Sequence, residues 1–114
     1  MIKTIAALFT VFALSTSALA GFDGPRATPK VVTAVSISDM RDDTKVTMEG
    51  HLVEQLSEEH YLFKDDTGDV KVEIDDKVFR GANVTPEIQI RLVGEVDKDW
   101  KMITVDVDSL EIVE

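Results

Sequence analysis

The fold is decided by the stretch Val46-Thr47-Met48-Glu49-Gly50-His51-Leu52, in which apolar and polar residues alternate. A period of two places the apolar side chains on one face of a strand and the polar side chains on the other. The strand extends to Leu56, so it is long enough to bend and to serve both halves of a barrel. Gly50 lies in its middle, where a bulge or a coil of the strand is expected.

Four further strands are predicted downstream, each bounded by turn residues. They cover residues 60–65, 70–74, 86–96 and 102–113. Pro86 suits the start of a strand because it cannot donate to a ladder of hydrogen bonds. Residues 75–81 break the alternation, begin with aspartate and end in glycine, which predicts a single helical turn between the third and fourth strands. Another short helix is expected over residues 33–43.

Five strands with a helix between the third and the fourth are the layout of the OB-fold, a small Greek-key barrel. An immunoglobulin-like sandwich would need about seven strands. We therefore predict an all-β domain over residues 33–114, a five-stranded OB-fold Greek-key barrel with one or two short helices.

The N-terminal residues 1–20 have the pattern of a cleaved secretory signal peptide. Lys3 supplies the positive charge, an apolar run extends from Ile5 to Leu14, and Ala18-Leu19-Ala20 supplies the cleavage site. The run is shorter than the about 20 apolar residues that span a membrane, so no membrane insertion is expected after cleavage. Residues 21–32, with Gly24-Pro25 and Pro29, are expected to form a flexible arm.

The composition limits the partners. The chain has 22 acidic and 12 basic residues, a formal net charge of −10 and no cysteine. A domain this acidic would repel phosphates, so nucleic acid and anionic lipid surfaces are excluded as partners, whereas cations, cationic peptides and sugars stay open. The absence of cysteine excludes an N-terminal lipid anchor, a disulfide framework, a thiolate metal site and a thiol nucleophile.

A family resemblance is carried by four stretches and their spacing. They are Met40–Gly50, Tyr61–Asp65 with Thr67-Gly68, Val72–Asp75 and Gly94–Trp100. Together they resemble the bacterial OB-fold (BOF) family of small periplasmic stress-tolerance proteins, and the leader with Gly21–Pro25 resembles the family's N-terminus. The resemblance implies a periplasmic barrel of a Gram-negative bacterium, associated with tolerance of oxidative, acid, metal or envelope stress. It supplies neither a ligand nor catalytic residues, and function inferred from fold and family alone is an analogy.

OB-folds bind ligands across strands two and three and the loops beside them. The candidate ligand-binding residues on that face are Tyr61, Phe63, Lys64, Lys71, Glu73 and Trp100. For Trp100, the favoured interpretation is a plug at one end of the barrel, because a small core has few aromatic side chains to spare. The alternative is a stacking surface for a sugar or a peptide.

Two groups of acidic residues are candidate cation sites. Asp65, Asp66 and Asp69 surround a glycine turn and are weak metal candidates, but they lack the alternating ligands and closing glutamate of a calcium loop. An ordinary hairpin turn is therefore favoured, and no metal is predicted. A second set could form an acidic patch that attracts cations, although solvated side chains are the favoured interpretation. That set is Asp97, Asp99, Asp106 and Asp108.

His51 and His60 are the only histidines. Isolated positions on the strand surface are the favoured interpretation for both, with pH sensing as the alternative. No P-loop, dinucleotide fingerprint or nucleophile elbow is present, so we expect neither an enzyme nor a cofactor.

The leading hypothesis is a monomeric, periplasmic, non-enzymatic binding module that holds a small polar, cationic or glycan ligand and contributes to stress tolerance. One alternative is an interaction module that docks on a larger envelope protein through an exposed strand edge. Another is a weak buffer of metal cations.

Overall fold

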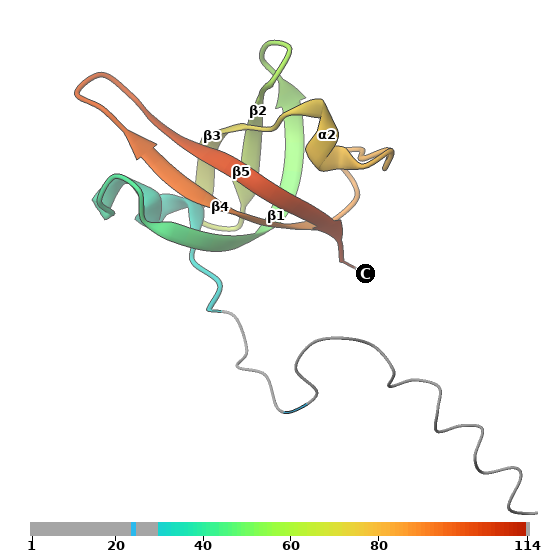
Figure 1. The fold of residues 1–114 in the computed structure, drawn as a ribbon, viewed down its shortest axis with the longest axis horizontal. Coiled ribbons are helices and arrows are strands. Elements are labelled where there is room, and N and C mark those ends of the chain that lie inside the picture. Colours follow the sequence, from blue (N-terminus) through green and yellow to red (C-terminus); the bar gives the residue numbers. More distant parts are fainter. Residues whose placement is uncertain (1–23, 25–29, 114) are drawn as a thin grey trace, which may run out of the picture.

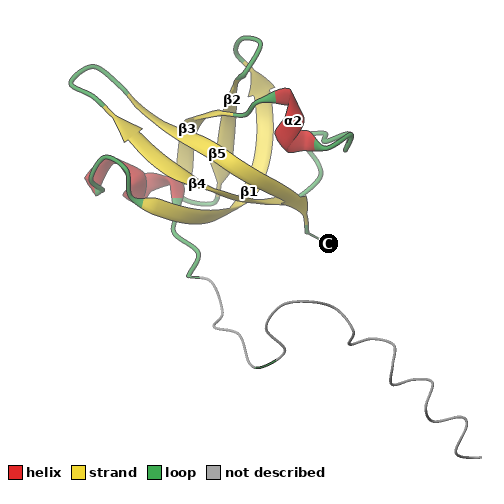
Figure 2. Cartoon of the chain, in the orientation of Figure 1, coloured by secondary structure: helices red, strands yellow, loops and turns green. Residues whose placement is uncertain are grey.

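Five strands form a closed barrel in the order β1-β2-β3-β5-β4 (Figure 1). The structure is a computed structural model that describes Gly24 and residues 30–113, so the predicted signal peptide and most of the predicted arm lie outside the described residues. The elements are η1 (Ala34–Asp39), β1 (Lys45–Gln55), β2 (His60–Asp65), β3 (Gly68–Glu73), α2 (Asp76–Phe79), β4 (Ile90–Lys98) and β5 (Ile103–Ile112). Figure 2 shows the two short helices at opposite sides of the barrel.

The long first strand serves both halves of the barrel, as the sequence predicts. The first half of β1 pairs with β4, from Lys45 opposite Glu95 to Gly50 opposite Ile90. The second half pairs with β2, from His51 opposite Lys64 onward. A parallel pairing of β3 with β5 closes the barrel. The predicted OB-fold is confirmed, with α2 between the third and fourth strands.

The core is formed by the inward side chains of all five strands and of η1. Its fully buried members include Met48, Phe63, Val72, Ile74, Ile90, Leu92, Val96 and Val105. Gly50 lies where β1 changes its partner from β4 to β2, and a Cβ atom there would clash with the carbonyl oxygen of Lys64. The glycine therefore permits the bend that lets one strand join both halves of the barrel.

The first helix is shorter and tighter than predicted. It is a 3-10 helix over Ala34–Asp39, whereas the sequence predicts a helix over residues 33–43. A 3-10 helix has three residues per turn, so Ala34 and Ile37 share its buried face. Val35, which the helical spacing of the predicted 33–43 helix groups with Ile37, is instead 61% exposed. Upstream, Val31 of the predicted arm forms a parallel bridge with Thr47 of β1.

The fourth strand begins later than predicted. The alternation predicts a strand from Pro86, but β4 begins at Ile90. The chain before it makes a turn in which the N–H of Ile88 donates to the carbonyl of Thr85 at 3.0 Å. The carbonyl of Gln89 accepts instead from the N–H of Val113, beyond β5, at 2.8 Å. Residues 86–89 therefore separate from β1 and leave part of its edge without a neighbour.

Candidate functional site

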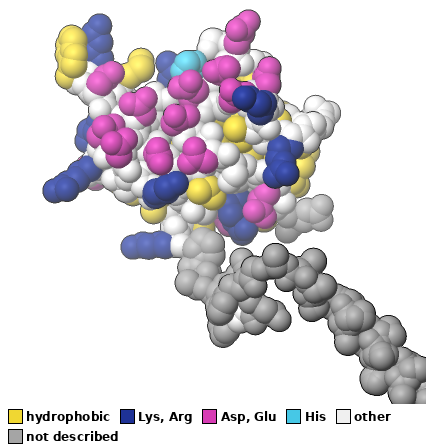
Figure 3. All heavy atoms as spheres, in the orientation of Figure 1, with side chains coloured by type: hydrophobic (Ala, Val, Ile, Leu, Met, Phe, Trp, Pro, Cys, Tyr) yellow, Lys and Arg dark blue, Asp and Glu magenta, His cyan; other side chains and the backbone are white. Residues whose placement is uncertain are grey.

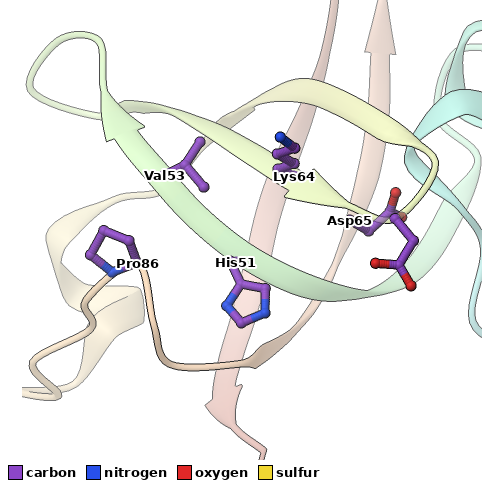
Figure 4. A pocket seen from close by; sticks show the side chains of 6 residues that line it. His51, Val53, Lys64, Asp65 and Pro86 are labelled. Atoms are coloured by element: carbon purple, nitrogen blue, oxygen red, sulfur yellow. The ribbon is translucent and has the colours of Figure 1, made fainter.

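A groove runs along the open edge of β1, between that strand and the connection from α2 to β4. Its first cavity, of about 290 Å³, is lined by His51, Val53, Lys64, Asp65, Asp66 and Pro86 (Figure 4). A second cavity, of about 230 Å³, shares Val53 and Pro86 with the first and continues toward α2. It adds Leu52, Glu54, Gln55, Tyr61, Phe79 and Val84. We call these two cavities together the β1 groove.

His51 lies in the wall of the β1 groove. Its side chain is half-buried, and its Nδ1 atom is the one buried side-chain nitrogen or oxygen in residues 30–113 that lacks a hydrogen-bond partner. Leaving such an atom unpaired costs about 1–3 kcal/mol. The favoured interpretation from the sequence, an isolated histidine on the strand surface, is therefore incomplete. A residue of the groove wall thus holds a buried polar atom with unused hydrogen-bonding capacity.

Charged side chains lie beside this imidazole. Lys64 is directly opposite His51 in the β1–β2 pairing, and it is exposed to solvent. Figure 4 shows both side chains projecting from neighbouring strands, with Asp65 at one end of the cavity and Pro86 and Val53 at the other. The first cavity is therefore lined by four polar or charged side chains and by two apolar residues, Val53 and Pro86.

Tyr61 marks the end of the β1 groove next to α2. Its ring makes an edge-to-face contact with Phe79, with ring centroids 5.6 Å apart and an interplanar angle of 69°. Burial, together with the negative charges of Asp76 and Glu59, raises the pKa of its hydroxyl above the ordinary value. Tyr61 therefore stays protonated and can donate a hydrogen bond at neutral pH.

The other predicted ligand-binding residues are dispersed. Phe63 is wrong as a contact residue, because it is 0% exposed and belongs to the core. Lys71 and Glu73 lie on β3, opposite Leu62 and His60 of β2, and line neither cavity of the groove. The structure thus brings Tyr61 and Lys64 to the groove and leaves Lys71 and Glu73 outside it.

Trp100 does not plug the barrel. It lies in the turn between β4 and β5 and is 89% exposed. Lys101 Nζ lies 5.0 Å from the centroid of its ring. The turn is held by Asp99, whose Oδ1 accepts from the backbone N–H groups of Lys101 and Met102, each at 2.8 Å. The favoured interpretation of Trp100 as a plug is wrong, because this hairpin extends beyond the barrel.

The aspartate turn between β2 and β3 is held by hydrogen bonds within the protein. Both carboxylate oxygens of Asp65 accept hydrogen bonds, from the N–H of Ala34 and from the N–H and hydroxyl of Thr67. Asp66 and Asp69 are exposed to solvent. In the part of the chain that the structure describes, no group of three or more histidine or acidic residues could hold a metal ion. The hairpin interpretation is therefore favoured by the geometry.

Acidic side chains do gather on one face of the barrel. Figure 3 shows Asp and Glu side chains grouped over the face that β5 crosses. Burial, and the negative charges of Glu73, Asp108, Asp97 and Glu95, raise the pKa of Asp106 above its ordinary value. Asp97, Asp106 and Asp108 therefore share one acidic face, which is the alternative that the sequence left open, while Asp99 is engaged in its own turn. Lys45 offsets part of this charge, 3.5 Å from Glu95 and 3.7 Å from Asp108.

The fold and the groove define a small OB-fold barrel with a groove on its surface. The family model described as "Bacterial OB fold (BOF) protein" matches residues 11–112, and the chain belongs to this family. Within residues 30–113, no helix is long and apolar enough to cross a membrane.

Curated relatives agree with this assignment. Protein YgiW of Escherichia coli K12 is 38% identical, with 97% of this chain and 98% of YgiW covered. The calcium-regulated OB-fold protein CarO of Pseudomonas aeruginosa is 37% identical, with 82% of this chain and 81% of CarO covered. The solved structure of the E. coli protein YgiW covers 83% of this chain and 100% of its own, with a TM-score of 0.73 and 42% identity.

Proposed function

We propose that this chain is an exported, non-enzymatic binding module that holds a small polar, cationic or glycan ligand in the β1 groove. We further propose that it acts in the periplasm and contributes to tolerance of oxidative, acid, metal or envelope stress. The leader pattern of residues 1–20 supports the location. Membership of the bacterial OB-fold family supports a binding role.

The observation that carries this proposal is the unpaired Nδ1 of His51 in the wall of a groove. A half-turn of the imidazole about χ2 exchanges Nδ1 with Cδ2, so a ligand in the groove can satisfy the nitrogen that the free protein leaves unpaired. The hydrogen bond then contributes about 0.5–1.5 kcal/mol to affinity, the net value of an ordinary hydrogen bond. Lys64 and Asp65 provide charged groups of both signs for a polar ligand.

The side chains around the groove favour binding over catalysis. A serine–histidine pair does exist, since Ser57 Oγ lies 2.9 Å from His60 Nδ1. His60 Nε2 also lies 3.8 Å from Glu73 Oε1. The serine is exposed in the β1–β2 turn, and the pair lines neither cavity of the groove. Nucleophilic catalysis requires a substrate position next to the nucleophile, so this pair is better explained as a turn contact.

A thermal-shift experiment tests the proposal. Protein expressed from the full sequence would be titrated with spermidine, calcium and a muropeptide, each at a large excess. A ligand that binds only the folded state stabilises it, by about 2.7 kcal/mol at a concentration of 100 times its Kd. We expect at least one probe to raise the Tm, and a flat response to all three would overturn the proposal.

Two matched histidine variants locate the site. His51→Ala removes the groove imidazole, and His60→Ala removes the one that lies outside the groove. We expect the ligand-induced shift to fall in His51→Ala and to persist in His60→Ala. A shift that is the same in both variants would place the ligand elsewhere on the barrel.

A further inference from the structure

The second half of β1 has one open edge. Residues 51–55 pair with β2 on one side, whereas the pairing with β4 on the other side ends at Gly50. The backbone hydrogen bonds of the described loops and turns include none from residues 51–55 to residues 82–89. Backbone N–H and C=O groups on an unpaired edge are a template for another strand.

The β1 groove lies beside this edge, so there is space for a backbone there. Val53 and Pro86 line both of its cavities, and Val84 lines the second. Figure 4 shows Pro86 on the chain segment that faces β1 across the first cavity. Proline has no N–H to offer to β1, so this wall cannot itself complete the ladder at that position.

The charge around the groove selects the chemistry of a partner. The lining carboxylates are those of Glu54, Asp65 and Asp66, and the one lining ammonium group is that of Lys64. A third cavity, which shares Tyr61 and Phe79 with the groove, adds the carboxylate of Asp76. A partner with basic side chains complements this surface, and the negative charge of the whole chain also attracts it.

We propose that an extended, basic peptide segment binds in the β1 groove as an added strand on the edge of residues 51–55. The inference rests on the proposed function and names the class of its ligand. Main-chain hydrogen bonds to the edge supply affinity, and the surrounding carboxylates select lysine or arginine side chains. His51 and Tyr61 line the groove, so their polar groups are available to a peptide that lies along it.

A bulge limits the length of the added strand. The register of β1 against β2 shifts between Leu52 and Glu54, so Val53 is the extra residue. A bulge bends the strand and increases its twist. The peptide is therefore held over a short stretch, and a long flat strand is disfavoured, which also protects the edge from aggregation.

The test uses a fluorescein-labelled peptide of alternating lysine and threonine, with both ends blocked. Binding to protein expressed from the full sequence would be followed by fluorescence anisotropy. Two control peptides carry N-methyl groups on every second backbone nitrogen, one peptide at the odd and the other at the even positions. Methylation keeps the charge of the peptide and removes those main-chain hydrogen-bond donors. We expect at least one N-methylated peptide to bind about tenfold more weakly, the loss expected for about one hydrogen bond. Equal binding of all three peptides would overturn strand addition.

Matched variants test the position. Asp66→Lys reverses a charge that lines the groove, and Asp97→Lys reverses one on the acidic face, where it lines neither cavity. Both aspartates are exposed, so both variants are expected to fold. We expect Asp66→Lys to bind the peptide about tenfold more weakly and Asp97→Lys to change binding about twofold or less. Equal losses would show binding by charge alone and overturn the inference.

Hydrogen exchange supplies a direct backbone readout. The bound peptide should slow exchange of amides within residues 51–55, with no matching change in β5. The peptide could fail to bind while spermidine, calcium or the muropeptide still gives a thermal shift that depends on His51. That result would overturn strand addition and leave the proposed function standing. Failure of every probe would overturn both.

Discussion

The backbone N–H of Ala34 donates a hydrogen bond of 2.8 Å to the carboxylate of Asp65, which joins the start of η1 to the end of β2. The other carboxylate oxygen accepts from the N–H of Thr67 at 2.8 Å and from its hydroxyl at 2.6 Å. Ala34 is 3% exposed and belongs to the core. One carboxylate at the edge of the β1 groove thus fixes both a helix and a hairpin.

Replacing this carboxylate should destabilise the barrel. In Asp65→Asn, the side chain loses its charge and one acceptor, so part of this network is broken. We expect the free energy of unfolding, measured in urea at neutral pH, to fall by about 1–2 kcal/mol. The control is Asp66→Asn at the exposed neighbouring position, which should change it by about 0.5 kcal/mol or less. Equal effects would mean that the turn tolerates either change and that the bond to Ala34 is unimportant.

The carboxylate of Asp65 should also make the free energy of unfolding depend on pH in the acid range. Burial raises the pKa of Asp65, but the hydrogen bonds from Thr67, Ala34 and Gly68 outweigh it, so the pKa lies below the ordinary value of 3.8. A lowered pKa means that the stabilisation is fully present above the unfolded pKa and is lost as the pH falls through the folded pKa. The stability gap between the wild type and Asp65→Asn should therefore narrow below about pH 3.8. A gap that stays constant in acid would exclude the ionised carboxylate as its source.

Asp106 should show the opposite sign. Its raised pKa means that the folded protein binds this proton more tightly than the unfolded chain. The associated stability is present at low pH and is lost as the pH rises through the folded pKa. Asp106→Asn should therefore raise the free energy of unfolding at neutral pH, by a few tenths to about 1 kcal/mol.

The salt dependence distinguishes repulsion between Asp106 and its acidic neighbours from other causes of the gain in stability. The Debye length is about 10 Å at 0.1 M salt and about 3 Å at 1 M, so the gain in Asp106→Asn should shrink in concentrated salt. Asp39→Asn, on η1, serves as the control because Asp39 is exposed and is not among the charges that raise the pKa of Asp106. An undiminished gain in 1 M salt would point to a packing effect of the amide.

The strands with strong local alternation could be predicted from the sequence. Residues 60–65 were predicted as a strand and form β2 with the same bounds, because the turns on both sides are encoded locally. The start of β4 could not be predicted in this way. Residues 86–89 continue the alternating pattern, but a hydrogen bond from Val113, distant in sequence, draws Gln89 away from β1.

The candidate site was predicted only in part, for the same reason. Lys64 and Tyr61 are predicted because they lie on the second strand, which OB-folds use for binding, and both line the β1 groove. His51 was missed as a site residue because its environment depends on the absence of a neighbouring strand. A pattern of period two reports which face a side chain occupies, and it carries no information on whether a strand edge is covered.

The close approach at Gly50 predicts a large cost for a single methyl group. In Gly50→Ala, the new Cβ would clash with the Lys64 carbonyl and lie 2.7 Å from Cζ of Phe63, which is buried in the core. We expect a loss of about 2–3 kcal/mol in urea denaturation, since overpacking shifts the backbone. Gly81→Ala is the control, because its φ of 80° is strained for alanine but its surroundings are open. Its loss should be about 1 kcal/mol, and an equal loss at both glycines would argue against a steric cause at Gly50.

The exposed hairpin tip predicts that Trp100 is dispensable for folding. Its side chain is 89% exposed and contacts Lys101 by a cation–π interaction, so Trp100→Ala removes little buried surface. We expect the free energy of unfolding, followed by circular dichroism, to change by about 0.5 kcal/mol or less. Phe63→Ala, in the core, should lose about 3–5 kcal/mol by comparison. A loss in Trp100→Ala that approaches the loss at Phe63 would mean that the tryptophan packs against the barrel in solution, and would restore its role as a plug.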